Sequence, residues 1–163
     1  MYQHILLPTD GSALSREAVV AGIAFARDAG AAVLGCHVVT LPPADRLDAW
    51  LHHDPHYAQR RQALFEKAAD EYLAFVAACA AAQNVRCACV KAHGHEPARE
   101  IVAMASREAC DLIYMASHGW KGDAGQWPGS GMLDVLRHSR VPVLVHKAAA
   151  QASVGATAKE ERR

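Results

Sequence analysis

The sequence predicts a single α/β domain in which helices cover both faces of a five-stranded, mostly parallel sheet. Three observations lead to this prediction: short continuous apolar runs, helical periods between those runs, and a length of 163 residues that fits one domain. An apolar run without polar alternation is typical of a strand buried on both faces. Parallel strands need crossover connections, and the intervening helices provide them.

The first strand is expected at residues 4–10, "HILLPTD", where a proline and turn-forming residues end the apolar run. In the helix that follows, Ser12 is placed to cap the start and Gly30 to end the helix. Apolar or small residues recur there near the helical period, at Leu14, Ala18, Gly22 and Phe25. This strand and helix form the first repeating unit.

The second strand is expected at Ala32–Val39, and a second helical pattern covers about residues 57–83. One face of this helix is predicted to be apolar and to carry Leu64, Ala68, Phe75 and Cys79. The segment between strand and helix, residues 41–56, contains three prolines and no clear period. It is interpreted as a loop or lid.

Three further apolar runs predict the remaining strands, at residues 85–92, 111–117 and 141–147. A helix that has Pro97 in its first turn, where a missing N–H costs nothing, separates the first two of these strands. A short helix near residues 129–139 precedes the last strand. Residues 148–163 lack large apolar side chains and are expected to be a disordered tail, which leaves residues 1–147 as the domain.

Composition excludes several classes of partner. Lys and Arg together number 17, as do Asp and Glu, so there is no basic excess to attract nucleic acid or an acidic membrane surface. No apolar run approaches the ~20 residues that span a bilayer. The five cysteines are an odd number, and the N-terminus lacks the pattern of a secretion signal, so a cytoplasmic location is expected.

A ligand site is expected beyond the carboxyl ends of the strands, where an open parallel sheet binds its ligands. Three segments follow strand ends and could face one cleft: "PTDGS", "HVVT" and "SHGWKGDAGQWPGSG". Asp10, in the first segment, is placed to hold a ribose hydroxyl or, through a cation, a phosphate. Its other interpretation is a helix-capping residue ahead of Ser12.

The glycine-rich segment before the last helix has the composition of an anion site. Glycines leave backbone N–H groups accessible, and the helix N-terminus that follows favours a phosphate. Lys121 is a candidate to neutralise that charge. In the alternative interpretation the loop binds no ligand, and Trp120 and Trp127 cover the sheet edge or a dimer contact.

Several segments together resemble the universal stress protein family. They are "ILLPTDGS", "HVV", "GHEPAREIVAMA", "DLIYMASHG", a glycine-serine pair and "VLRHSRVPVLV", in this order and over nearly the whole folded part. Nucleotide-binding members carry glycine, two residues, glycine, nine residues, glycine, then serine or threonine. Here Gly119, nine residues and Gly129-Ser130 match that spacing, and Ala116 replaces the first glycine.

The resemblance implies an adenine nucleotide alpha-hydrolase-like, Rossmann-like fold that binds ATP, with or without Mg. Asp10 would contact ribose or the phosphate and metal region, Val38 would offer backbone groups to adenine, and Gly119, Gly129 and Ser130 would cradle phosphates. Met132 stands where binding members commonly have a small hydroxyl residue, and Ala116 adds a methyl group. The full set of expected nucleotide-binding residues is Pro8, Thr9, Asp10, Val38, Ala116, His118, Gly119, Gly129, Ser130 and Gly131.

The expected function is therefore that of a homodimeric, ATP-binding stress protein that signals through its nucleotide state, with AMP or another adenine ligand left open. The dimer is expected to form through "VPVLV", from Val141 to Val145, because an exposed apolar edge strand favours pairing. The alternative is a dimeric interaction protein of the same fold that binds no nucleotide. An enzyme is the weakest option, because no Walker motif or nucleophile elbow is present, so at most slow ATP hydrolysis is expected.

Three other groups of residues were candidates for chemistry. His52, His53 and His56 lie close in sequence, but a zinc site needs further ligands and none is evident nearby, so a solvated lid is favoured. Cys87 and Cys89 point to one face of a strand, where inert packing is favoured over a strained bridge. His93 and His95 belong to a strand-to-helix turn near the cleft, with a ligand contact as the alternative.

Overall fold

The computed structural model describes residues 1–41, 56–117 and 130–147. They form one five-stranded sheet with the strand order β3-β2-β1-β4-β5. All four strand pairings are parallel, so the predicted sheet is confirmed and has no antiparallel strand among the described residues. The strands are β1 (His4–Pro8), β2 (Ala32–Val39), β3 (Cys87–His93), β4 (Leu112–Ala116) and β5 (Val143–His146).

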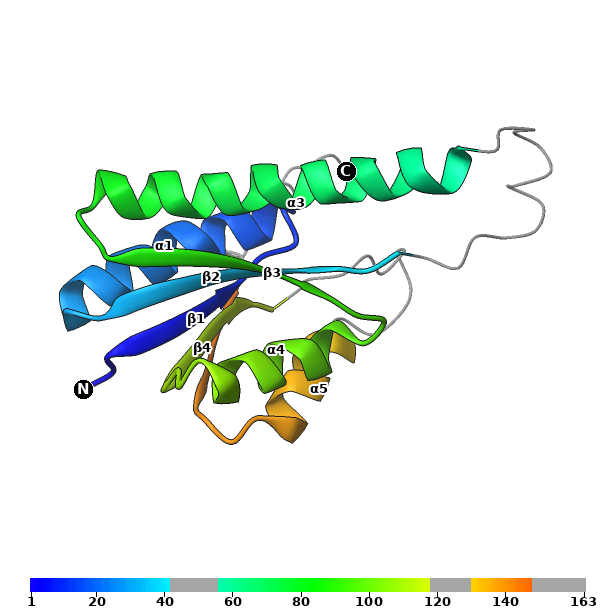
Figure 1. Cartoon of the computed structure of the whole chain (residues 1–163). Coiled ribbons are helices and arrows are strands. Elements are labelled where there is room, and N and C mark those ends of the chain that lie inside the picture. The colour runs from blue at the N-terminus through cyan, green and yellow to red at the C-terminus, as the bar shows by residue number, and fades with distance from the viewer. Residues whose placement is uncertain (42–55, 118–129, 148–163) are drawn as a thin grey trace, which may run out of the picture.

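Among the described residues, four helices cover the two faces of the sheet, and helices on both faces were predicted. Figure 1 shows which helices lie above the sheet and which lie below it. The upper pair is α1 (Ala13–Ala29) and α3 (Tyr57–Ala82), and the lower pair is α4 (Pro97–Arg107) and α5 (Ser130–His138). The sheet therefore separates two hydrophobic cores, one under each pair of helices.

Strand β1 is buried on both of its faces. Ile5 and Leu7 pack into the core with α1 and α3, whereas Leu6, between them, packs into the core with α4 and α5. All three side chains are at most 1% exposed. Since successive side chains of a strand point to opposite faces, a central strand of such a sheet must be apolar at every position.

The caps of α1 follow the sequence prediction. The Ser12 side chain accepts a hydrogen bond from the backbone N–H of Ser15 at 3.2 Å, which satisfies one N–H group of the first turn. Gly30 adopts the left-handed conformation with φ +68° and ends the helix. These caps fix where the chain leaves β1 and where it returns to β2.

The predicted apolar face of α3 was wrong by about one position. Its buried residues are Ala69, Leu73, Val76 and Ala80, while Phe75 and Cys79 are only partly buried. Leu64 is 68% exposed. Glu66, two residues further along the helix, instead contacts His93 of β3. Figure 1 shows that the beginning of α3 projects past the end of the sheet.

Several sequence expectations fall outside the described residues. These are the structure of the lid over residues 42–55, of the glycine-rich segment over residues 118–129, and of the tail over residues 148–163. Among the helices that are described, none is long and apolar enough to cross a membrane.

Candidate functional site

A cavity of about 470 Å³ opens at the carboxyl ends of β1, β2 and β4. Its volume falls within the range of about 300–1,000 Å³ that is typical of small-molecule sites. The chain runs from β1 to β2 and β3 on one side, then crosses to β4 and β5 on the other. The cavity therefore lies at the switch point of the sheet, where open α/β folds bind their ligands.

Three strands and three helices line the cavity. The strand ends contribute residues that follow or finish the apolar runs, one residue comes from the start of α1, and α4 and α5 close the opposite side. The lining residues from the strand side are Pro8, Thr9, Asp10, Cys36, Val38, Thr40, Met115 and Ala116. Those from the helices and the turn before α4 are Ser15, His95, Glu96, Pro97, Ala98, Arg99, Ile101, Gly131, Met132, Asp134 and His138.

The loop between β1 and α1 is held in place by hydrogen bonds. The Thr9 hydroxyl lies 2.8 Å from the Ser15 hydroxyl and accepts the Gly11 N–H at 3.2 Å. Buried His37 donates from Nδ1 to the Thr9 carbonyl oxygen at 2.7 Å. The backbone that leads into the cavity is thus fixed from both β2 and α1, which gives any ligand a preorganised surface.

Asp10 makes the local contact expected from one of the two interpretations that the sequence left open, that of a residue capping the start of the helix. Its Oδ1 accepts the backbone N–H of Ser12 at 3.0 Å, which is the local turn expected of an aspartate before a helix. Asp10 also lines the cavity. A carboxylate has about four acceptor sites, so the turn does not exhaust its capacity for hydrogen bonds.

The structure brings six of the ten expected binding residues to this cavity: Pro8, Thr9, Asp10, Val38, Ala116 and Gly131. The backbone of Ser130 begins α5, directly before Gly131 in the lining. His118, Gly119 and Gly129 lie outside the described residues.

Met132, one of the two departures from the family pattern, lines the cavity and packs against the core below the sheet. Ala116, the other departure, is 5% exposed and sits at the end of β4. Cys36 forms part of the same wall, and its burial raises the pKa of its thiol to about 12. The part of the cavity wall formed by Met132, Ala116 and Cys36 is therefore uncharged and largely apolar, as is typical of small-molecule sites.

Sequence reasoning missed Arg99, Asp134 and His138, which reach the cavity from the first turn of α4 and from α5. Arg99 forms an exposed ion pair with Glu96 at 3.1 Å. No motif marks these residues, because the two helices converge only in the folded protein. The order of the strands and the predicted start of α4 at Pro97 were the only available signals.

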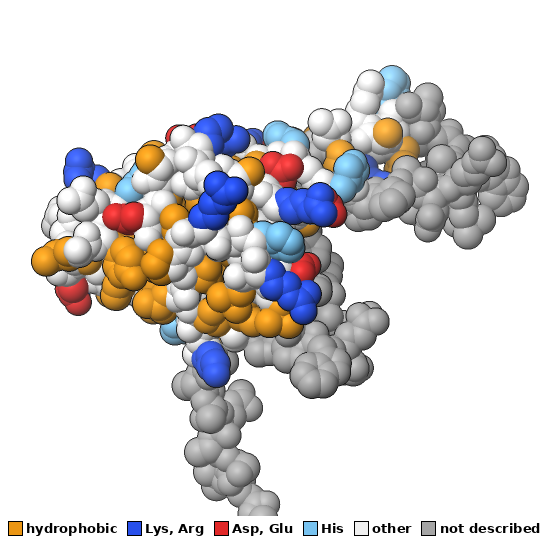
Figure 2. Space-filling view, turned by 90° about the horizontal axis from the view of Figure 1, so that it is seen from below, with side chains coloured by type: hydrophobic (Ala, Val, Ile, Leu, Met, Phe, Trp, Pro, Cys, Tyr) orange, Lys and Arg blue, Asp and Glu red, His pale blue; other side chains and the backbone are white. Residues whose placement is uncertain are grey.

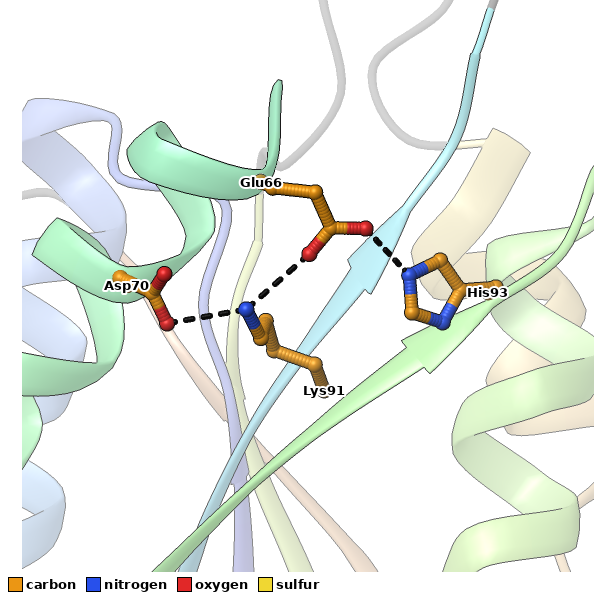
Figure 3. Close-up of polar contacts among 4 residues, drawn as sticks. All are labelled: Glu66, Asp70, Lys91 and His93. Carbon is orange, nitrogen blue, oxygen red and sulfur yellow. Dashed lines mark hydrogen bonds and ion pairs between the residues drawn. The ribbon is translucent and has the colours of Figure 1, made fainter. Parts of the chain in front are cut away.

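The other histidine candidates lie away from this site or have other partners. His93 approaches Glu66 of α3 at 2.6 Å, and the other Glu66 oxygen accepts from Lys91, which also pairs with Asp70 (Figure 3). Hydrogen bonds from His93 and Lys91 lower the pKa of Glu66. Since the four side chains are between about a quarter and two thirds exposed, water screens these pairs and they stabilise the α3–β3 contact only modestly.

Exposed His56 bonds to the side chain of Gln59 at 3.2 Å, while His52 and His53 lie outside the described residues. Within the described part of the chain, no group of three or more metal-binding side chains is present. His95 differs from these histidines because it lines the cavity.

The burial expected of the Cys87 and Cys89 thiols was wrong for Cys89, which is exposed, while Cys87 is half-buried. That the thiols are inert stays a prediction. Both lie on β3, which is an edge strand and therefore has a neighbouring strand on one side only. Their two sulfur atoms are 4.0 Å apart, so the prediction that both point to one face is confirmed.

Comparison with known proteins identifies the family. The model of the universal stress protein family matches residues 1–147. The chain belongs to this family. A curated universal stress protein of Methanocaldococcus jannaschii, MJ0531, is 31% identical over 150 residues, which cover 90% of this chain and 83% of that protein.

Solved structures of universal stress proteins and similar proteins share the fold. The structure of hypothetical protein MJ0577 is 26% identical, with a TM-score of 0.71, and the match covers 91% of this chain and 98% of that one. A universal stress protein in complex with cAMP is 22% identical, with a TM-score of 0.65, and 89% of this chain and 97% of that one are covered. Related structures contain dAMP, in Archaeoglobus fulgidus, and AMP, in Arabidopsis thaliana. At 17% identity and a TM-score of 0.60, each of these two shows likeness of fold.

Proposed function

We propose that this universal stress protein binds an adenine nucleotide in the cavity at the carboxyl ends of β1, β2 and β4. The observation that carries the proposal is the convergence of Asp10, Val38 and Gly131, from three separate segments, on one cavity of about 470 Å³. Structural relatives that bind cAMP, AMP and dAMP support the choice of an adenine nucleotide. ATP, with or without Mg, is the form we expect to act in the cell.

The two ends of a nucleotide would find different surroundings in this cavity. The apolar wall at Val38, Cys36 and Met115 suits the base, and the backbone at the end of β2 offers the hydrogen bonds that adenine needs. The first turn of α5 lies at the opposite wall with Gly131, where helix N–H groups favour phosphate oxygens. Asp10 lies where ribose hydroxyls or a phosphate-bound cation would be held.

The nucleotide would itself be the signal. Binding would change the surface around α4 and α5, which close the cavity. A protein that reads this surface could then distinguish the loaded from the empty state. We propose this nucleotide-dependent signalling as the role of the protein in the stress response.

The decisive experiment measures binding of Mg-ATP, AMP and cAMP by calorimetry, starting from protein freed of co-purified nucleotide. Asp10→Asn retains an oxygen for the Ser12 N–H and removes only the charge, so the fold should persist while nucleotide affinity falls. If the carboxylate accepts a hydrogen bond from ribose, the loss should be roughly 10- to 100-fold. Gly129→Glu, which would place a negative charge in the phosphate cradle, should abolish binding.

The matched control is Asp28→Asn, which removes an exposed carboxylate paired with Arg27 at the end of α1. Its affinity should equal that of the wild type. Unchanged affinity in both Asp10→Asn and Gly129→Glu would refute the placement of the ligand. Absence of heat and of a thermal shift with all three nucleotides would instead favour the alternative function, an interaction protein that binds no nucleotide.

We also propose a homodimer that forms through β5. Among the described strands, β5 pairs only with β4, so its outer edge has no partner in the sheet. Leu133 and Leu136 of α5, the helix before β5, are 40% and 42% exposed. Hydrophobic side chains gather on the face that α4 and α5 cover (Figure 2). A two-fold contact would cover this apolar surface and the strand edge together.

A further inference from the structure

Cys87 and Cys89 form a pair of neighbouring thiols on the edge strand β3, away from the cavity lining. Their sulfur atoms are 4.0 Å apart, and both cysteines are free. Cys89 is exposed and Cys87 is half-buried, so small solutes can reach the pair. Neither the proposed nucleotide site nor the proposed dimer edge at β5 uses these residues.

The strand beside this pair accommodates the Cys89 sulfur. Gly35 of β2 is the register partner of Cys89. A Cβ atom at Gly35 would lie 3.2 Å from the Cys89 sulfur and 2.8 Å from Cγ1 of Val76 on α3, so these two side chains fill the space that a larger residue at position 35 would need. The Cys89 thiol also donates to the Leu73 carbonyl oxygen of α3 at 3.5 Å.

The two thiols differ in acidity because they share a hydrogen bond. This bond, from Cys89, lowers the pKa of Cys87 to about 7, although partial burial opposes the change. The same bond and desolvation raise the pKa of Cys89. The thiolate is the form of cysteine that binds metals.

A disulfide fits this geometry poorly. Two strand residues separated by one position have Cα atoms roughly 6.6–6.8 Å apart, at the upper limit for a disulfide. The sulfur atoms would also have to approach from 4.0 Å to the ~2.05 Å of an S–S bond. A strand within a sheet resists that contraction, because its partner strand fixes the rise of each residue.

A bridging cation fits the geometry better. With metal–sulfur bonds of about 2.3 Å, two thiolates on opposite sides of one ion are at most ~4.6 Å apart. The observed 4.0 Å lies within that limit, so rotation of the side chains alone can admit the ion. Zinc would need further ligands, and no group of three metal-binding side chains exists among the described residues.

We propose that Cys87 and Cys89 form a two-thiolate site for a soft monovalent cation of the Cu⁺ class. Soft sulfur ligands select such ions over Mg²⁺ or Ca²⁺, and two ligands are enough for a d¹⁰ ion of low coordination number. Binding joins both sulfur atoms to Cu⁺ as thiolates, and the protons that the thiols carried pass to the buffer. The oxidation state of copper and sulfur is unchanged, so the step needs no oxidant or reductant.

The test uses reduced full-length protein under anaerobic conditions, titrated into the chromogenic complex of Cu⁺ with bicinchoninate. The wild type should withdraw one equivalent of Cu⁺. Cys87→Ser and Cys89→Ser should each lose that equivalent, since neither thiolate alone forms the site. Cys79→Ser is the matched control, because it removes another partly buried free thiol, from α3, and should retain one equivalent.

X-ray absorption at the copper edge should find two sulfur neighbours in the wild type and in Cys79→Ser. Far-UV circular dichroism and thermal melts of each variant show whether a variant that no longer binds Cu⁺ is still folded. A wild-type protein that leaves all Cu⁺ with bicinchoninate overturns the proposal. A folded Cys87→Ser or Cys89→Ser variant that still withdraws one equivalent overturns it equally.

Discussion

Gly11, in the loop that leads from β1 into the cavity, provides a sharp test of how this loop is built. Its φ is +76°, a left-handed conformation that a residue with a Cβ atom adopts at a cost of roughly 1–2 kcal/mol. A Cβ atom would also lie only 2.2 Å from Cε1 of Tyr72 on α3. Gly11→Ala therefore meets two separate penalties, one in the backbone and one in packing.

The packing penalty can be worked out from the contacts of Tyr72. Its ring packs edge-on against His37, with ring centroids 5.2 Å apart, and His37 in turn holds the Thr9 carbonyl oxygen. An alanine at position 11 must push the ring away, and overpacking of this kind costs typically 1–3 kcal/mol. Together the two terms give a destabilisation of about 2–5 kcal/mol.

Gly30→Ala separates the two terms. Gly30 has a similar φ of +68°, but a Cβ atom there would meet nothing within 4 Å. Its substitution should cost only the backbone term, roughly 1–2 kcal/mol. Because both variants change the unfolded chain in the same way, the difference of about 1–3 kcal/mol isolates the contact with Tyr72.

Urea unfolding and thermal melts measure this difference. For a chain of this size, about 1–3 kcal/mol corresponds to a Tm that is roughly 2–12 °C lower in Gly11→Ala than in Gly30→Ala. In a Tyr72→Ala background the two glycine substitutions should destabilise equally, since the clashing ring is gone. If Gly11→Ala destabilises no more than Gly30→Ala in the wild-type background, the packing argument is refuted.

Two further predictions concern stability and assembly. Burial raises the pKa of the Cys36 thiol to about 12, above its value in the unfolded chain. The folded state therefore favours the protonated thiol. The stability that Cys36 contributes is complete below about pH 9 and is lost as the pH rises toward 12. Between pH 8 and 10, the free energy of unfolding measured with urea should therefore fall by about 1–2 kcal/mol more in the wild type than in Cys36→Ala. Equal decreases in the two proteins would contradict the raised pKa of Cys36. Leu144→Lys, on the edge strand β5, should shift the protein from dimer to monomer in sedimentation analysis, whereas Val20→Lys, at an exposed valine of α1, should leave the dimer intact. A monomeric wild type at micromolar concentration would count against the β5 contact.

Much of the fold could be predicted because local pattern and tertiary environment agree. The run around Leu6 is apolar at every position, which only a strand buried on both faces requires, and that burial is observed. Ser12 and Gly30 end their helix for reasons that depend on a few neighbouring atoms. Part of the candidate site was predictable on the same basis, because Asp10 and Val38 follow from the ends of parallel strands meeting at one edge.

The sequence failed where the outcome depended on which elements become neighbours. Leu64 of α3 is apolar, yet its side chain is 68% exposed, while Glu66, two residues further along the helix, contacts His93 of β3. The same limit applies to Arg99 and His138, which belong to different helices and approach one cavity only because α4 packs against α5. No local pattern carries that information.

For this protein, sequence alone determined the parallel α/β domain, its helix caps and the strand ends that line the cavity, because each depends on periodicity or on a few adjacent residues. Tertiary structure decided the strand order, which places β3 at an edge and so exposes Cys89 beside Cys87. It also decided how α4 and α5 close the cavity. Both outcomes follow from contacts between segments far apart in the chain, and the energy of those contacts exists only after the chain has folded.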